Sequence, residues 1–194
     1  MNQIETIKDN SKIEVKLLKI EDLKKLMEFY RSLPFEDRKY LKVDVTDEAV
    51  VEKRLKTILE KKAVRVVALH QQKIVAEGEL FLSDDDWFRD QGEIRLIVAR
   101  NFQRKGLGVV MFRELYYLAL QHKVEKVVAK IMIPQKAAKA ILVRFGFKEE
   151  QVIPRFALDQ DHQKQDLLIM SCDMKDFWKE LESGYDGSDW QRCR

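Results

Sequence analysis

A glycine-containing segment in the middle of the chain has the residue types that bind an anion. Gln103–Gly108 lies between a run typical of a strand and a run typical of a helix, so backbone N–H groups and the positive end of the helix dipole converge there. Gly106 and Gly108 permit close backbone approach and unusual torsions, and Arg104 and Lys105 add positive charge. The combination suits a pyrophosphate.

Two common phosphate-binding motifs do not fit this segment. It lacks the Lys-Ser or Lys-Thr ending of the P-loop and the third glycine of the dinucleotide fingerprint. No acidic residue is placed where that fingerprint holds a ribose. The spacing therefore excludes both motifs.

The strands and helices around the segment follow from the spacing of apolar residues. Residues 12–19 alternate with the period of a half-buried strand, and residues 20–33 change to a helical period that ends at Pro34. Thr46 is the expected N-cap of a helix over 46–61. The other expected elements are strands over 64–69, 74–82, 93–99 and 124–133, a helix over 106–121, a short helix that ends at Phe145 before Gly146, and strands over 152–158 and 166–172.

Strands and helices that interleave in this way predict an α/β domain with a mixed sheet. The 194 residues include 7 Gly and 3 Pro and are 45% hydrophobic and 36% charged, which excludes collagen-like and disordered chains. We expect a single domain over 1–194, with a core over 12–172 and a polar, partly helical C-terminal extension over 173–194.

Charge and composition also exclude several classes of function. A formal net charge of +3 is too small to indicate nucleic-acid or membrane binding by itself. No long apolar run and no secretory signal are found, and neither Cys172, Cys193 nor the histidines have the spacing of metal ligands. We therefore expect a cytoplasmic protein without a metal, a membrane span or a nucleic-acid partner.

The segment from Val98 to Gly108 resembles the coenzyme A pyrophosphate loop of the GNAT superfamily of N-acetyltransferases, which reads Gln/Arg-x-x-Gly-x-Gly/Ala. Residues 137–149 resemble the second motif of the family, a helix followed by a hydrophobic residue, Gly and Phe, and residues 166–170 resemble its last strand. The order of the elements over 12–172 also matches. The resemblance implies a mixed, mostly antiparallel, splayed sheet of about seven strands flanked by about four helices, with a further helix in the C-terminal tail.

The resemblance also implies how this chain would bind acetyl-CoA. Backbone groups of residues 96–98 would pair with the pantetheine arm, and the amides of residues 104–109 would hold the pyrophosphate. Valine at Gly106 or Gly108 should then abolish cofactor binding and leave the core largely intact. The expected cofactor-binding residues are Leu96, Ile97, Val98, Gln103, Arg104, Lys105, Gly106, Leu107, Gly108, Val109 and Gln135.

Acetyl transfer to an amine requires a polarised thioester carbonyl and an acceptor for the proton of the amine. The resemblance implies that a backbone N–H near Val98 donates to the carbonyl and that Glu93 accepts the proton. Glu77 and Glu79 on the preceding strand are alternatives to Glu93.

Two positions depart from the pattern of the family. Lys130 stands where some relatives have a carboxylate, and Leu142 stands where others have a tyrosine that protonates the leaving thiolate. Tyr116, Tyr117 or a water are the alternatives for that acid. Further expectations concern Asp84–Asp86, which either attract a cationic amine or are merely solvated, Trp87, which lines the core or the cleft, and Phe177 and Trp178, which pack against their own domain.

These inferences predict an N-acetyltransferase, monomeric or homodimeric, in which a primary amine attacks acetyl-CoA directly in a ternary complex. Residues 31–55 faintly resemble the acetyltransferase part of bacterial protein lysine acetylases, so the acceptor is either a small amine or a protein lysine. The alternative is a noncatalytic acyl-CoA-binding or sensing module of the same fold.

Overall fold

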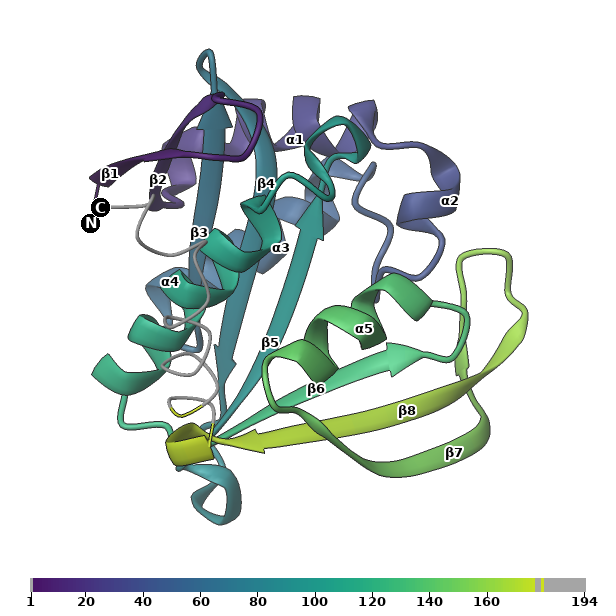
Figure 1. Cartoon of the computed structure of the whole chain (residues 1–194). Helices are drawn as coiled ribbons and strands as arrows, with labels where there is room; N and C mark the ends of the chain where they lie inside the picture. The colour runs from purple at the N-terminus through teal and green to yellow at the C-terminus, as the bar shows by residue number, and fades with distance from the viewer. Residues whose placement is uncertain (1, 177–178, 180–194) are drawn as a thin grey trace.

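One mixed sheet of eight strands runs through the computed structural model, which describes residues 2–176 and 179 (Figure 1). The strand order is β1-β2-β3-β4-β5-β6-β8-β7, and all neighbouring strands are antiparallel except β5 and β6. The strands are β1 (Asn2–Thr6), β2 (Lys12–Leu17), β3 (Ala63–His70), β4 (Lys73–Leu82), β5 (Gln91–Val98), β6 (Lys126–Met132), β7 (Lys148–Leu158) and β8 (Lys164–Asp173).

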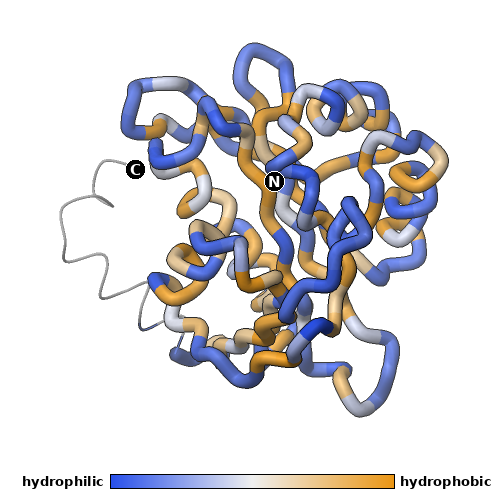
Figure 2. Tube along the Cα trace, turned by 90° about the vertical axis from the view of Figure 1, so that its right-hand side faces the viewer, coloured by the Kyte–Doolittle hydropathy of each residue, from blue (hydrophilic) through white to orange (hydrophobic). Residues whose placement is uncertain are grey.

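Helices cover both faces of this sheet and create two separate hydrophobic cores. One core joins α4 to the sheet around Leu107, Met111 and Leu115, and the other joins α1 and α3 to the opposite face around Leu26 and Leu55. Figure 2 shows hydrophobic chain in the interior and hydrophilic chain in the outer loops. The helices are α1 (Leu23–Ser32), α2 (Phe35–Arg38), α3 (Glu48–Leu59), α4 (Leu107–Gln121) and α5 (Lys136–Arg144), with short 3-10 turns η1 (Ile20–Asp22), η2 (Asp86–Phe88) and η3 (Arg100–Phe102).

The predicted class and order of elements are confirmed, with one strand more than expected. The extra strand is β1, which lies in the polar leader and pairs antiparallel with β2, so that Gln3 faces Val15. Pairing with a neighbour, rather than a strong apolar pattern of its own, holds this edge strand in place. Of the predicted C-terminal helix, the structure describes residues 174–176 and 179, which are helical, whereas Phe177, Trp178 and Cys193 fall outside the described residues.

Two local predictions were wrong. Asp47, not Thr46, caps α3: its side chain accepts from the amides of Ala49 and Val50, while Thr46 donates its hydroxyl to Asp44. Aspartate is as good an N-cap as threonine, so composition alone did not separate the two neighbours. Trp87 is 85% exposed in the β4–β5 loop and lines neither core nor cleft.

The sheet opens between β5 and β6. These two strands pair only over residues 91–93 and 126–128, and then separate as β5 continues to Val98. The chain then enters η3 and, through a tight loop, α4. The gap and the N-terminus of α4 therefore lie at the same end of β5 (Figure 1). No helix in the described part of the chain has the length and apolarity needed to cross a bilayer.

Candidate functional site

The edge of β5 that faces the gap presents backbone groups that pair with no neighbouring strand among the described residues. The amide of Ala99 donates to the carbonyl of Val75 at 2.9 Å, so the alternation of an antiparallel ladder turns Ile97 toward β4 as well. Leu96 and Val98 then point their N–H and C=O groups away from β4 and into the gap. The Val98 carbonyl accepts there from Gln103 Nε2 at 2.9 Å. An extended chain could add to this edge as a strand does.

The loop after β5 leads into an N-terminus of α4 that could bind an anion. Gly106 is the N-cap, with a left-handed φ of 90°, and the helix has no acidic residue in its first turn. Among the described residues, nothing accepts a hydrogen bond from the amides of Gly106, Leu107 and Gly108. Three donors and the positive helix end are therefore available to a phosphate.

Only one of the two glycines has an unusual torsion. Gly108 is helical, and a Cβ added there would meet Ile141 Cδ1 at an ordinary 3.9 Å. Gly108 therefore leaves open space between α4 and α5. Gly106 leaves space too, and in addition its backbone conformation favours glycine. The prediction of unusual torsions thus holds for Gly106 but not for Gly108.

Lys105 is held by the N-terminal hairpin that the sequence did not reveal. Its Nζ lies 2.8 Å from Asp9 Oδ2, and its carbonyl accepts from the Lys8 amide at 3.0 Å. The hydrogen bond from Lys105, followed by those from Ser11, lowers the pKa of Asp9 to about 2. Arg104, by contrast, is exposed, with a positive φ of 58°.

Gln135 and the candidates for the acid that protonates the thiolate lie in different places. Gln135 Oε1 accepts from the Met132 amide at 2.8 Å at the end of β6, so its side chain stands at the far wall of the gap. Leu142 and Tyr116 are buried in the core with α4, and Tyr117 is exposed. None of these three residues lies at the edge of β5 that faces the gap.

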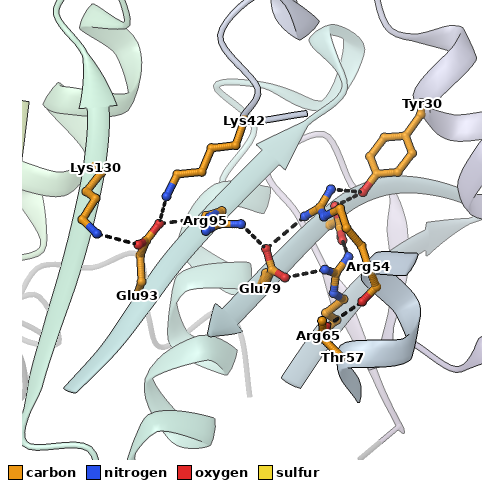
Figure 3. A network of polar contacts seen from close by, with 10 residues as sticks. Tyr30, Lys42, Arg54, Thr57, Arg65, Glu79, Glu93, Arg95 and Lys130 are labelled. Carbon is orange, nitrogen blue, oxygen red and sulfur yellow. Dashed lines mark hydrogen bonds and ion pairs between the residues drawn. The ribbon is translucent and has the colours of Figure 1, made fainter. Parts of the chain in front are cut away.

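The face of the sheet that α1 and α3 cover carries a buried polar network (Figure 3). Tyr30 donates to Glu77 at 2.5 Å, and Arg65 pairs with Glu77 at 3.0 Å and also with Glu79. Arg54 and Arg95 approach Glu79 Oε2 at 3.0 and 3.1 Å. Burial would raise the pKa of Glu79, but the three arginines bring it below its ordinary value.

The same environment keeps the Tyr30 hydroxyl protonated. Burial, and then the charge of Glu77, raise the pKa of Tyr30 well above its ordinary value. Tyr30 and Arg65 are each 1% exposed, and Glu77 is 5% exposed. Such buried charges persist only where partners satisfy them.

Glu93 lies at the outer end of this network, between three cations (Figure 3). Lys42 and Arg95 donate to Oε1, the latter at 3.0 Å, and Lys130 reaches Oε2 at 3.1 Å across the root of the gap. Burial alone would raise the pKa of Glu93, but the Lys42 hydrogen bond and the charges of Arg95, Lys42 and Lys130 lower it to about 2.

A small cavity of about 50 Å³ lies against this network. Its walls come from α1, the segment 41–45, α3, β4 and β5. The residues that give it polar character are Tyr30, Lys42, Arg54, Glu77, Glu79 and Arg95. None of the acidic run Asp84–Asp86 lines this cavity. Asp84 pairs instead with Lys62 at 3.1 Å.

Comparison with known families decides the relationship. Residues 23–147, more than half of the chain, match the acetyltransferase (GNAT) family. The chain belongs to the GNAT family. The resemblance carried by the loop over 98–108 is thereby confirmed. Comparison of the sequence with curated proteins gives no match.

Solved structures of GNAT acetyltransferases share the fold at low identity. Ribosomal-protein-S5-alanine acetyltransferase from Vibrio fischeri has a TM-score of 0.74 at 14% identity, covering 85% of this chain and 94% of its own. The yncA protein from Salmonella typhimurium, solved with its cofactor acetyl-CoA, gives 0.71 at 17%, covering 84% and 94%. Mycobacterium smegmatis RimJ, solved with CoA-disulfide, gives 0.70 at 12%, covering 94% of each chain.

Proposed function

We propose that the chain transfers an acetyl group from acetyl-CoA to a primary amine by direct attack in a ternary complex. The observation that carries the proposal is the coincidence of two features at one end of β5. The strand exposes the backbone groups of Leu96 and Val98 to a gap, and the three α4 N-terminal amides that have no acceptor among the described residues follow eight to twelve residues later. A ligand with an amide-containing arm and a pyrophosphate fits both.

The described residues divide the binding task. Leu96 and Val98 would pair with the pantetheine amides, Gly106–Gly108 would donate to the pyrophosphate, and Gln135 would border the arm from β6. When bound, acetyl-CoA supplies the thioester whose acetyl group moves to the amine. A gap-facing N–H near Val98 is placed to donate to the carbonyl oxygen as charge develops on it.

For the proton of the amine we propose Glu77 in place of the first choice from sequence, Glu93. Glu77 pairs across the ladder with Ile97, between the two backbone groups that face the gap, and it lines the cavity with Tyr30. Glu93 lies four residues before Ile97 on β5, and three cations lower its pKa to about 2. A carboxylate so stabilised in its ionised form is a weak proton acceptor.

The first test is a thermal melt with and without acetyl-CoA. Ligand at ~100 times its dissociation constant stabilises by about 2.7 kcal/mol, which raises the midpoint by several degrees. Gly108→Val should remove this shift because the added side chain fills the open approach to the amides, and its helical backbone tolerates a Cβ. Gly106→Val should act likewise.

A matched control separates strain from ligand binding. Gly146 also has a left-handed φ, of 80°, but it ends α5 and does not belong to the loop. Gly146→Val should therefore lower the melting temperature as Gly106→Val does and keep the shift caused by acetyl-CoA. No shift in the wild-type chain would eliminate the acetyl-CoA site.

Thiol release from acetyl-CoA in the presence of amines then tests transfer. Glu77→Gln should reduce turnover by about a hundredfold or more, with the acetyl-CoA shift intact, whereas Glu93→Gln should act mainly on the acceptor KM. If Glu93→Gln reduced turnover more than Glu77→Gln, Glu93 would be the proton acceptor. Binding without thiol release for any amine would leave the sensing module as the function.

A further inference from the structure

The charges on the acceptor face are balanced at one end and unbalanced at the other. In the inner part, Arg54 and Arg65 face Glu77 and Glu79. In the outer part, Lys42, Arg95 and Lys130 surround the single carboxylate of Glu93. Across these described residues, cations exceed carboxylates by two, and the whole excess lies around Glu93.

These three cations are accessible although the carboxylate between them is not. The side chains of Lys42, Lys130 and Arg95 are 42%, 40% and 33% exposed, and that of Glu93 is 12% exposed. Each lysine ammonium has three donors and uses one on Glu93, since no other described residue bonds to either ammonium. Donors with unneutralised positive charge thus face the solvent around Glu93, and two of the three cations, Lys42 and Arg95, also line the cavity.

Like charges at this place disfavour each other. Burial, and then the charge of Arg95, lower the pKa of Lys42, and Lys130 adds to the effect. A second anion beside Glu93 would relieve this repulsion. The arrangement already holds a carboxylate with donors on both of its oxygens, which is the geometry that a further carboxylate needs.

The position of the cluster relates it to the acceptor rather than to the cofactor phosphates. The anion loop follows β5, whereas Glu93 and Lys130 lie where β5 and β6 begin to part. Arg95, which lines the cavity, is two residues from Ile97, or about 7 Å along the strand. An amine near Glu77 and an anion near Arg95 would then be several bonds apart in one molecule.

We propose that the acceptor is a small amine that also bears a carboxylate about four or five carbons away, and that Lys42, Arg95 and Lys130 bind this carboxylate. The proposal rests on the proposed acetyl transfer and names its substrate class. Polyamines without an acid group are disfavoured because the excess positive charge of the cluster repels them. The cavity of about 50 Å³ also favours a narrow aliphatic acceptor over an aromatic one.

The test compares amines that differ in the carboxylate alone. Thiol release from acetyl-CoA is measured with 5-aminopentanoate against pentylamine, and with lysine against cadaverine. We expect kcat/KM for the acid of each pair to exceed that of its partner by about tenfold or more, mostly through KM.

Two variants connect this preference with the cluster. Lys130→Gln should remove most of the preference by raising KM for the acids and should leave pentylamine unchanged or improved; Lys42→Gln should act in the same direction. Lys126→Gln is the matched control, because Lys126 lies on the same strand with an equal exposure, 41% against 40%, but pairs with Asp173. Lys126→Gln should change kcat/KM for neither member of a pair.

The outcomes separate the two proposals. Equal or better turnover of pentylamine and cadaverine, or a loss in Lys130→Gln shared by both members of a pair, overturns the carboxylate site and leaves acetyl transfer standing. Acetyl-CoA binding without transfer to any of these four amines also overturns the carboxylate site, whereas acetyl transfer itself is overturned only if no amine, including a protein lysine, releases thiol.

Discussion

The two sides of β5 offer a ligand different kinds of chemical group: backbone groups on one side and side chains on the other. On the side of the gap, the groups available to a ligand are backbone N–H and C=O groups over 96–108, and their placement depends on one strand, one loop and one helix end. On the other side, the groups are the neutral hydroxyl of Tyr30 from α1 and ionised side chains from the segment 41–45, α3 and β3–β6. A backbone site tolerates many side chains, whereas a side-chain network depends on each partner.

The largest effect that this comparison predicts is on folding stability. Arg65→Met leaves the buried Glu77 with Tyr30 as its one described hydrogen-bond partner, so the free energy of unfolding should fall by about 3–5 kcal/mol. Arg104→Met, an equivalent change in the exposed loop of the cofactor side, should change it by less than about 0.5 kcal/mol. Urea denaturation at neutral pH measures both.

A second substitution shows whether the loss comes from an unpaired charge. Adding Glu77→Gln to Arg65→Met removes the buried carboxylate, so the double variant should be more stable than Arg65→Met alone. If the second change made the protein still less stable, the loss would come from packing, and the network would not differ in kind from the apolar core.

The difference in material also explains what the sequence could predict. The anion loop could be found because Gly106, Gly108 and the apolar periods on either side are neighbours in the chain, and backbone sites are local. The ion pair between Asp9 and Lys105 could not be predicted, because it depends on the pairing of β1 with β2. Residues 2–6 give only a weak strand pattern.

The acceptor network was missed for the opposite reason, although a signal exists. Arg65, Glu77 and Glu79 interrupt strands that are otherwise apolar, and charged residues inside such strands are rarely buried without partners. That pattern announces a buried network but does not identify Tyr30, Arg54 or Lys42 as its partners. Their approach depends on how α1, α3 and the segment 41–45 pack on the sheet.

A smaller effect separates two carboxylates that share a pKa of about 2. Asp9 belongs to the loop side and Glu93 to the acceptor side. The folded pKa of Glu93 is below its ordinary 4.5, so its stabilising contribution is complete above about pH 4.5 and is lost as the pH falls toward about 2. The stability difference between the wild type and Glu93→Gln should therefore shrink on acidification from pH 5 to 3.

Salt should distinguish the two sites. Asp9 pairs at the surface, where ions screen the Lys105 charge, whereas Glu93 is largely enclosed by its three cations. In carboxyl-carbon NMR titrations, added salt should return the pKa of Asp9 toward 3.8 more than it returns that of Glu93 toward 4.5. Equal sensitivity would mean that the acceptor network is as open to solvent as the loop.

The smallest predicted effect concerns the one place where a side chain competes with the backbone site. Lys105 is bound to Asp9, so a phosphate near the loop must share or displace that partner. In the wild type, Asp9 Oδ1 accepts a hydrogen bond from the Ser11 amide at 3.1 Å. Asp9→Asn keeps an oxygen for this hydrogen bond and removes the charge that holds Lys105. The affinity for acetyl-CoA should rise about two- to fivefold, the range of a solvent-exposed ion pair.

Lys105→Gln tests whether the gain passes through Lys105. In that background Asp9→Asn should change affinity no further, and calorimetric titration of acetyl-CoA into the four proteins closes the cycle. A gain that survived without Lys105 would come from removing the negative charge of Asp9 itself. If Asp9→Asn changed nothing, Lys105 would not contact the phosphates, and the site would rest on the amides of Gly106–Gly108 and the helix end alone.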